Sequence, residues 1–323
     1  MRISRERLAA EATATRFRPE LLEKVIHLLS LLDTIRSHPD LTGRVVLKGG
    51  TALNLFIFDV PRLSVDIDLN YVGGEARETM QAERPLVEGA IQEVLARAGH
   101  TVTRVSSEHA GGKWRFRYDS ATGGQANLEV DLSFMYRVPL WAPQTLDSRL
   151  VGSYSAQGIP VLDVHELAAD KLAALFARTS GRDLFDAHRL LSEAGLERER
   201  LRLAFVVYGA MQRRDWRTVS MADITFDRGE LEGQLLPTFR SDALPDGLLP
   251  AAWAARLVEE TREALGVLLP FTPPESDFLG RLLDHGEIVP ELITDDRELA
   301  DRIRRHPSLH WKALNVRKHK GDH

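Results

Sequence analysis

The 323-residue sequence contains no cysteine. This excludes a disulfide scaffold, a cysteine nucleophile and a thiolate metal site, and it is typical of proteins in a reducing compartment. No window approaches the roughly eighteen uninterrupted apolar residues of a membrane span, and the basic start MRISRERLAA is not followed by an apolar segment. We therefore expect a cytoplasmic protein with no membrane partner and no secretory signal.

Neither sign of charge is in large excess. The formal net charge is −5 and the pI is near 6.1, which argues against a protein that coats nucleic acid. Proline and glycine are not in excess either, with 15 and 23 residues, so long disordered stretches are not expected. The length is sufficient for two domains that each have a core.

The charge is unevenly distributed along the chain. Between Arg302 and His323 there are seven Lys or Arg residues and one acid, Asp322, so this segment carries +6 and the remainder −11. Such a basic segment on an acidic body is either a surface that faces RNA or phosphate, or a solvated tail that aids solubility. Trp311 within it either stacks on a base or anchors a terminal helix.

The first half of the chain mixes predicted helices and strands. Apolar spacing predicts a long amphipathic helix at 19–38 and another of about twenty residues with Pro85 in its early turn. Strands are predicted at 45–47, 64–72, 101–107, 113–118 and 127–134, with a turn at Gly111-Gly112.

From about residue 163 the pattern is helical almost throughout. Asp163 and Glu166 have the spacing of a capping box, and Ser180-Gly181 separates two helices. The segment 138–162, punctuated by proline and glycine, is a plausible crossover between domains. The sequence therefore predicts an α+β protein with a mixed sheet in an N-terminal domain, residues 1–160, followed by a helical domain, residues 161–323.

Two carboxylates alternate on one predicted strand. In SVDIDLNYV, Ser64, Asp66 and Asp68 lie on the face opposite Ile67 and Leu69. Aspartates two apart on a strand are about 6–7 Å from each other and repel unless a cation lies between them. Alone, this pattern more often marks a solvated strand face.

The context favours a metal site. The strand Val45–Leu47 leads into Lys48-Gly49-Gly50-Thr51 and then a helix, a geometry that lets backbone approach a phosphate. A second acidic strand face, with Glu129 and Asp131, lies downstream. Carboxylates from two strands suit Mg²⁺ or Mn²⁺ in phosphoryl chemistry. We take Asp131 as the third ligand because its side chain is shorter, with Glu129 as the alternative.

These residues resemble a known family. Lys48-Gly49-Gly50-Thr51 followed by Ser64-x-Asp66-x-Asp68 looks like the first motif of the nucleotidyltransferase superfold shared with DNA polymerase β. The sequence is most similar to the AbiEii/MenT-type toxins of toxin–antitoxin and phage-defence loci. Their later motifs also have counterparts, Leu167-x-x-x-Lys171 and Arg182-Asp183-x-x-Asp186, so the resemblance runs from about residue 45 to 195. Thr51 departs from the serine of many superfamily members.

Lys171 is notable without the family. It lies four residues after Leu167 and four before Leu175, on a helix face that should be buried. An unpaired buried ammonium is costly, so an anion is expected there: Asp183, Asp186 or a triphosphate. The alternatives are a lysine stem that reaches solvent and a purely structural pair.

The resemblance implies a metal-dependent nucleotidyltransferase toxin that transfers a nucleoside monophosphate from an NTP to an RNA acceptor, the tRNA 3′ end being expected. It also implies a cognate antitoxin protein. In this interpretation Asp66, Asp68 and Asp131 hold the metal, and Lys171 and Asp186 are catalytic. The nucleotide contacts are expected from Lys48, Gly49, Gly50, Thr51, Ser64, Arg182 and Asp183, while Arg62 is a weaker candidate for a phosphate contact.

Two rival functions stay open from the sequence. One is an enzyme that modifies a small molecule such as an antibiotic, which would need a pocket and no basic surface. The other is a catalytically silent module that binds a nucleotide or a partner protein. The acids of the motif are intact, which argues against the silent module.

Overall fold

The computed structural model describes residues 3–98, 101–104, 111–178, 180–243 and 249–321. The chain divides into two compact units that are discontinuous in sequence. A sheet unit comprises residues 1–137, 143–162 and 236–247, and a helical unit comprises residues 138–142, 163–235 and 248–323. Residues 138–142 belong to the helical unit although the chain on both sides of them belongs to the sheet unit. Residues 236–247 belong to the sheet unit although the chain on both sides of them belongs to the helical unit.

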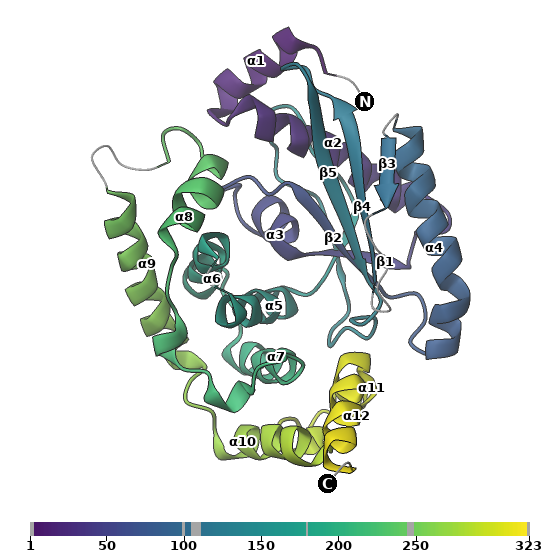
Figure 1. The fold of residues 1–323 in the computed structure, drawn as a ribbon, viewed down its shortest axis with the longest axis vertical. Helices are drawn as coiled ribbons and strands as arrows, with labels where there is room; N and C mark the ends of the chain where they lie inside the picture. Colours follow the sequence, from purple (N-terminus) through teal and green to yellow (C-terminus); the bar gives the residue numbers. More distant parts are fainter. Residues whose placement is uncertain (1–2, 99–100, 105–110, 179, 244–248, 322–323) are drawn as a thin grey trace. The chain divides into compact units, whose positions relative to one another are not determined.

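The sheet unit contains two long helices and all of the described strands (Figure 1). Helix α2 begins at Pro19, a favourable first position, and ends at Ser37, just before His38-Pro39. The elements of the unit are α1 (Arg5–Thr15), α2 (Pro19–Ser37), β1 (Val45–Lys48), α3 (Gly49–Ala52), η1 (Leu53–Ile57), β2 (Asp66–Tyr71), α4 (Arg77–Arg97), β3 (Thr101–Arg104), β4 (Gly111–Asp119), β5 (Gln125–Ser133), β6 (Gln144–Leu146), β7 (Ile159–Val161) and η5 (Leu236–Thr238).

The strands form one seven-stranded mixed sheet in the order β3-β4-β5-β2-β1-β7-β6. Strand β2 is central, antiparallel to β1 and parallel to β5. Its apolar residues Ile67 and Leu69 are buried, 0% and 2% exposed, on the face covered by α2 and α4. The other face of β2 carries Asp66 and Asp68, so the predicted alternation is confirmed.

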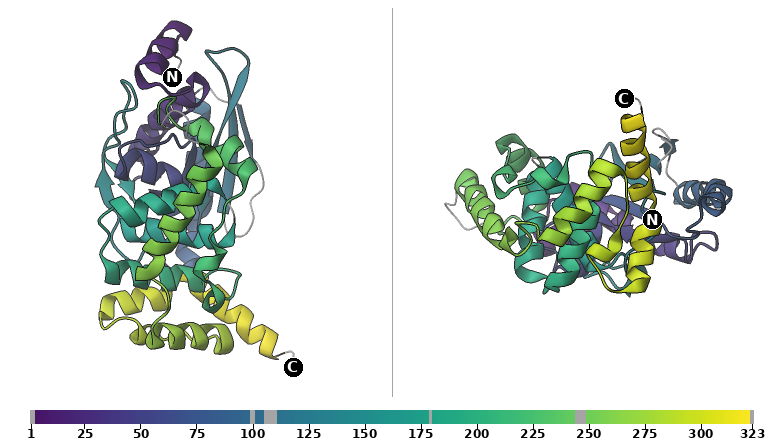
Figure 2. Two further views of the ribbon diagram at one scale, coloured as in Figure 1. Left: turned by 90° about the vertical axis from the view of Figure 1, so that its left-hand side faces the viewer. Right: turned by 90° about the horizontal axis from the view of Figure 1, so that it is seen from below.

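The helical unit contains a core of α5, α6 and α7 followed by shorter helices (Figures 1 and 2). Its elements are α5 (Val164–Ala177), α6 (Gly181–Glu193), α7 (Arg198–Ala210), η2 (Trp216–Thr218), η3 (Met221–Asp223), α8 (Arg228–Glu230), η4 (Leu231–Leu235), α9 (Pro250–Ala264), η6 (Leu265–Val267), α10 (Pro273–Gly280), η7 (Arg281–His285), η8 (Pro290–Leu292), α11 (Arg297–Arg305) and α12 (Pro307–Gly321). The predicted fold class, an α+β protein with a mixed sheet and a helical part, is confirmed.

Two local predictions are wrong. Pro85 lies inside α4 rather than in its early turn, because the helix already begins at Arg77. Gly111 and Gly112 do not form a turn; they begin β4 and pair with Ser133 and Leu132. The segment 105–110 that precedes them lies outside the described residues.

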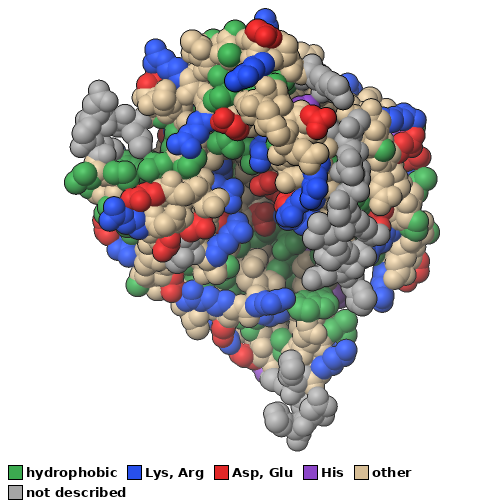
Figure 3. Space-filling model, turned by 45° about the horizontal axis from the view of Figure 1, so that its top comes forward, with side chains coloured by type: hydrophobic (Ala, Val, Ile, Leu, Met, Phe, Trp, Pro, Cys, Tyr) green, Lys and Arg blue, Asp and Glu red, His purple; other side chains and the backbone are tan. Residues whose placement is uncertain are grey.

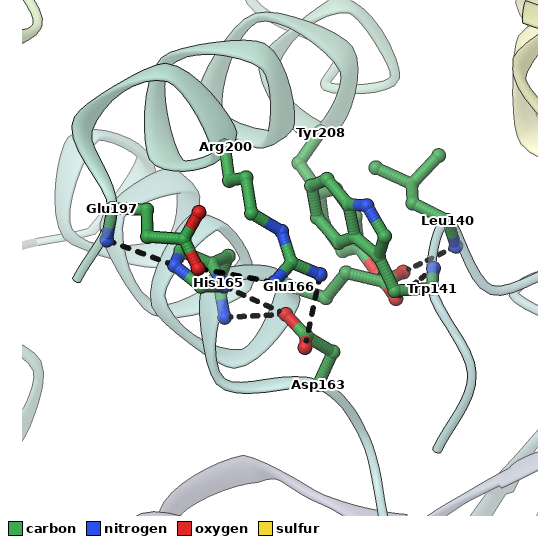
Figure 4. Close-up of polar contacts among 8 residues, drawn as sticks. All are labelled: Leu140, Trp141, Asp163, His165, Glu166, Glu197, Arg200 and Tyr208. Atoms are coloured by element: carbon green, nitrogen blue, oxygen red, sulfur yellow. Dashed lines mark hydrogen bonds and ion pairs between the residues drawn. The ribbon is translucent and has the colours of Figure 1, made fainter. Parts of the chain in front are cut away.

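The capping box predicted at the start of α5 is also wrong. Asp163 is the N-cap, accepting a hydrogen bond from the N–H of His165 at 2.9 Å. Glu166, however, accepts hydrogen bonds from the backbone N–H groups of Leu140 and Trp141, at 3.0 and 3.1 Å (Figure 4). The carboxylate therefore fixes the 138–142 segment to the helical unit instead of closing the helix end.

The Glu166 carboxylate is fully buried and accepts three hydrogen bonds. Besides the two backbone N–H groups, the hydroxyl of Tyr208 donates to it at 2.8 Å. Burial raises the pKa of Glu166 to about 7, against the lowering effect of these three donors.

His165 is held in one tautomer beside this carboxylate (Figure 4). Its Nε2 accepts from the N–H of Glu197 at 3.0 Å, so Nδ1 donates to Asp163 at 2.9 Å. Arg200 lies 4.5 Å from the centre of the Trp141 ring and pairs with the other oxygen of Asp163. The short 138–142 segment is thus held by both its backbone and its one tryptophan.

We predict a pH-dependent stability from Glu166. Its pKa in the folded protein is raised above the ordinary value of 4.5, so its contribution is fully present below pH 4.5 and is lost as the pH rises to about 7. Glu166→Gln should remove this slope. Urea unfolding of both proteins between pH 4.5 and 8 measures it.

The matched control is Glu263→Gln, since Glu263 is exposed in α9. It should keep the wild-type pH dependence. An identical slope in wild type and Glu166→Gln would contradict the assignment. The glutamine amide also meets one backbone donor, so Glu166→Gln should be less stable than wild type below pH 4.5 by about 1–3 kcal/mol.

Candidate active site

Four carboxylates lie together on the sheet face opposite the one that carries Ile67 and Leu69. In the parallel pairing of β2 with β5, Asp66 lies opposite Glu129 and Asp68 opposite Asp131. Partners on adjacent strands are about 4.8 Å apart and alternate residues on one strand about 6–7 Å apart. We call these four residues the acidic face. Their mutual repulsion has to be offset by cations.

The strand on the far side of β5 supplies cations. Lys113 and Arg115 on β4 lie opposite Asp131 and Glu129. Lys113 contacts Glu129 at 2.8 Å and Asp131 at 4.0 Å, and Arg115 contacts Glu129 at 2.5 Å. Burial raises the pKa of Glu129, but hydrogen bonds from Lys113 and Arg115 outweigh it and leave this pKa below its usual value.

Glu129 and Asp131 are therefore not equivalent. Glu129 is engaged by two cations within 3 Å, whereas the shorter Asp131 is half exposed and lies 4.0 Å from one of them. This geometry favours Asp131 over Glu129 as the carboxylate that accompanies Asp66 and Asp68.

The glycine turn lies directly beside Asp68. Gly49 has φ +73°, a conformation that side chains other than glycine rarely adopt, and a Cβ placed there would lie 2.3 Å from Oδ2 of Asp68. A Cβ on Gly50 would lie 3.0 Å from the hydroxyl of Ser64 and 3.2 Å from the guanidinium of Arg62. The two glycines thus let the side chains of Asp68, Ser64 and Arg62 approach the backbone of the turn closely.

The polar residues around the turn have different environments. Lys48 lies opposite Asp68 in the β1–β2 pair, and its Nζ is 5.1 Å from the centre of the Tyr136 ring. Ser64 and Arg62 are both buried beside Gly50, and Arg62 donates to the carbonyl of Leu63 at 2.9 Å. Arg62, a weak candidate from sequence, therefore lies at the turn itself.

Thr51 is engaged in the fold. Its side chain is fully buried, and its hydroxyl donates to the backbone carbonyl of Asp66 at 2.6 Å. The hydroxyl therefore fastens the start of the helix to the start of β2, and any nucleotide contact from Thr51 would come from its backbone.

The donor set suits a hard divalent cation. Asp66, Asp68 and Asp131 offer oxygen ligands from two neighbouring strands, the chemistry that Mg²⁺ or Mn²⁺ prefers. In the part of the chain that the structure describes, no three His, Asp or Glu side chains already converge as ligands of one ion. The residues fit such an ion chemically, with side-chain rotation needed to close around it.

A second charged cluster lies within the helical unit. Lys171 on α5 has its Nζ 2.8 Å from Asp183 and 3.1 Å from Asp186 on α6. The aspartate side chains are 2% and 0% exposed, and Lys171 is 10% exposed. The anion predicted for the buried lysine is therefore this aspartate pair, and the two helices are joined through it.

Asp183 has a second cation. Arg178 donates to its other oxygen, so both carboxylate oxygens are engaged. Burial raises the pKa of Asp183, but the positive charges of Lys171 and Arg178 outweigh it and hold this pKa below its usual range. Arg182, the basic residue of the same motif, is half-buried one position before Asp183 on α6.

On the surface, charges of both signs are interspersed on the face drawn in Figure 3. No helix in the described part of the chain is long and apolar enough to span a membrane.

Comparisons with known proteins bear on this geometry. A family model described as nucleotidyl transferase AbiEii toxin, type IV TA system, matches residues 30–279. Among curated protein sequences, none matches the chain.

Two solved structures are similar to it. One is MenT4, a nucleotidyltransferase toxin from Mycobacterium tuberculosis H37Rv, with 19% identity, a TM-score of 0.58, and 94% of this chain and 99% of that one covered. The other is JHP933 from Helicobacter pylori, with 16% identity, a TM-score of 0.49, and 78% and 94% covered. The likeness to MenT4 shows a shared fold.

We predict that Gly49→Ala disrupts the acidic face. The new Cβ would overlap the Asp68 carboxylate, so that side chain must move or the turn must distort. Gly43→Ala is the matched control, because Gly43 also has φ +73° but has nothing within 4 Å of its Cβ position. Each substitution should cost about 1–2 kcal/mol of stability from backbone strain; Gly49→Ala should cost more, measured by thermal unfolding.

Equal unfolding temperatures for the two variants would contradict the close approach of Gly49 and Asp68. The structural consequence can be read separately from NMR or a crystal structure, in which only Gly49→Ala should move Asp68.

A further prediction concerns the lysine cluster. Lys171→Met leaves two buried aspartates without their shared ammonium, so it should cost about 3–5 kcal/mol in stability. Adding Asp186→Asn should recover part of that loss. The coupling is measured by a double-mutant cycle in urea. Additive effects of the two changes would show that the pair makes no net interaction.

Proposed function

The chain belongs to the AbiEii family of nucleotidyltransferase toxins of type IV toxin–antitoxin systems, and from that premise we propose that it transfers a nucleoside monophosphate from an NTP to an RNA acceptor. The fold is that of a nucleotidyltransferase toxin, and the resemblance drawn from the motifs is confirmed. The 3′ end of tRNA is the proposed acceptor, and a cognate antitoxin protein is the proposed partner.

The observation that carries this proposal is the acidic face beside the glycine turn. Asp66 and Asp68 lie on the central strand, Asp131 lies opposite Asp68, and the backbone of Gly49 lies in close approach to the Asp68 carboxylate. A purely structural strand face has no need for carboxylates in register on two strands. It also has no need for a left-handed glycine in contact with one of them.

In the proposed reaction, the acceptor hydroxyl loses its proton and its oxygen forms a bond to the α-phosphorus of the NTP. The bond from that phosphorus to the β-phosphate oxygen breaks, and pyrophosphate leaves. Asp66, Asp68 and Asp131 would hold Mg²⁺ or Mn²⁺, which when bound neutralises phosphate charge and lowers the pKa of the attacking hydroxyl.

The remaining residues bind and orient. Gly49 and Gly50 allow the backbone to approach the phosphates, and Thr51 holds that backbone against β2. Ser64 offers a hydroxyl and Lys48 a cation on the acidic-face side of the turn. This is catalysis by positioning and electrostatic stabilisation, with no covalent intermediate on the protein.

The lysine cluster of the helical unit has a proposed role through its motif. We assign Lys171 to charge neutralisation and Asp186 to its orientation, with Arg182 and Asp183 as further nucleotide contacts. The double variant Lys171→Met/Asp186→Asn separates this role from a structural one. Recovered stability without turnover supports it, whereas a folded and fully active Lys171→Met protein would refute it.

The central test is labelling of RNA. Purified protein incubated with total tRNA and each α-³²P-labelled NTP in Mg²⁺ should label the RNA with at least one nucleotide, and EDTA should abolish the signal. Asp66→Ala and Asp68→Ala should each lower the rate by about two orders of magnitude or more. The phosphorus label must be on the α-phosphate, because a γ-label would leave with pyrophosphate.

Asp295→Ala is the control for the loss of a carboxylate, since Asp295 is exposed and lies outside the acidic face. It should label RNA at the wild-type rate. Labelling by Asp66→Ala or Asp68→Ala at that rate would refute the site. Labelling of a small hydroxyl acceptor in place of RNA would leave the transferase reaction standing and change its substrate.

A further inference from the structure

Helix α12 (Pro307–Gly321) leaves an aromatic side chain in solvent. Trp311 is 50% exposed and Leu314, one turn later, is 55% exposed. The opposite side of the helix is buried through Leu309 and Ala313, 0% and 5% exposed. Since the helix is anchored without Trp311, this tryptophan does not act as the anchor of the terminal helix. Figure 2 shows α12 (yellow) projecting beyond the other helices of its unit.

Four exposed residues of α12 form one stripe along the helix; Arg317 is exposed as well but donates to the carbonyl of Gly286. His310, Trp311, Leu314 and Lys318 follow at intervals of one, three and four residues, so they share a face. We call these four residues the α12 stripe. Residues 307–321 contain no Asp or Glu, so positive charge on this face is not offset from within the helix.

Most other basic residues of this segment are engaged. Arg302 pairs with Glu298 and Arg305 with Asp301, at 2.8 and 2.7 Å, and Arg304 pairs with Glu291. Two more donate to backbone carbonyls at 2.6 Å, Lys312 to Gln212 and Arg317 to Gly286. The basic segment is thus neither a uniform basic surface nor a solvated tail.

Lys318 differs from these residues. It has no ion-pair or hydrogen-bond partner among the residues that the structure describes, and it is exposed. It lies seven positions after Trp311, about 10 Å farther along the helix axis. A flat aromatic ring and an available ammonium thus lie along the same face, at a spacing that a short run of nucleotides covers. The side chain of Lys320 lies outside the described ones.

We propose that the α12 stripe binds the single-stranded end of the RNA acceptor, with a base stacked on Trp311 and a backbone phosphate at Lys318. This rests on the proposed function in taking RNA as the acceptor. Stacking on an aromatic ring with adjacent cations is how proteins bind single strands without reading sequence.

RNA accounts for the stripe better than a protein partner does. A protein interface requires a continuous apolar centre, whereas only two large apolar side chains are exposed here and they are flanked by His310 and Lys318. Because α12 contains no Asp or Glu, the positive charge of Lys318 is not offset within the helix and is available to the phosphates of RNA.

The test measures RNA binding directly and without NTP. The probe is a short single-stranded RNA with the CCA end of tRNA and a fluorescein label, followed by anisotropy on the full-length protein. Trp311→Ala should weaken binding about tenfold, and Trp311→Phe should retain most of the affinity because a ring remains. Lys318→Ala should make the dependence of log affinity on log salt shallower by about 0.7.

Intrinsic fluorescence provides a second readout that folding defects do not mimic. Of the other four tryptophans, Trp114, Trp216 and Trp253 are at most 7% exposed, and Trp141 is half-buried with the Arg200 guanidinium 4.5 Å from its ring centre. RNA bound along α12 should therefore quench chiefly Trp311. The quenching should disappear in Trp311→Phe. Leu150→Ala is the control for truncating an exposed apolar side chain, since Leu150 belongs to the sheet unit and is 69% exposed, and it should leave RNA binding and quenching unchanged.

Unchanged RNA affinity and unchanged quenching in the Trp311 variants would overturn the proposal and leave the stripe as a protein-facing surface. Because no NTP is present, this outcome is independent of the transferase reaction. If the acidic face proves inactive while Trp311 still governs RNA binding, the proposed function fails and the RNA surface stands.

Discussion

Repulsion among carboxylates is the constraint around which the sheet unit is organised. Asp66 and Asp68 occupy the central strand, and the parallel pairing with β5 brings two more acids alongside them. A sheet face of this kind is unfavourable unless cations lie next to it. Lys113 and Arg115 on β4 partly meet that need from one side, with Glu129 as their main partner. Under the proposed function, a divalent cation held by Asp66 and Asp68 would reduce this repulsion further.

The helical unit also contains a charged cluster, but there a single cation lies between two anions. One ammonium, Lys171, is buried between α5 and α6, and two nearly inaccessible aspartates face it. Removing one partner of such a cluster lowers the free energy of unfolding strongly, because a buried charge is left unpaired. The intact cluster, by contrast, adds little stability compared with apolar side chains of the same volume. A fold has little reason to retain it for stability alone, which is why a chemical role for Lys171 is worth testing apart from its structural one.

The sequence predicted what depends on local periodicity and failed where distant segments meet. Alternation identified β2 and β5 because each strand has one buried apolar face, and the acids then had to share the other. Glu166 has the spacing of a capping residue, yet its carboxylate is taken by the N–H groups of Leu140 and Trp141. Nothing local to α5 signals that competition. Pro85 marked a helix start because proline is favoured there, although α4 accommodates it inside.

Discontinuity of the units explains the remaining difficulty. Residues 138–142 belong to the helical unit, although the chain on both sides of them belongs to the sheet unit, and residues 236–247 make the converse excursion. A five-residue excursion is too short to pair its own backbone groups, although its side chains are apolar and Val138 and Leu140 are each 1% exposed. Its backbone donors must find acceptors, and a fully buried glutamate supplies them at the cost of a raised pKa. The charge that Glu166 carries above about pH 7 therefore lies on a residue that satisfies the backbone of a short segment. The spacing of Glu166 and the alternation in β2 are local patterns, but the groups that these residues contact lie far away in the chain: Leu140 and Trp141 for Glu166, and β5 for β2.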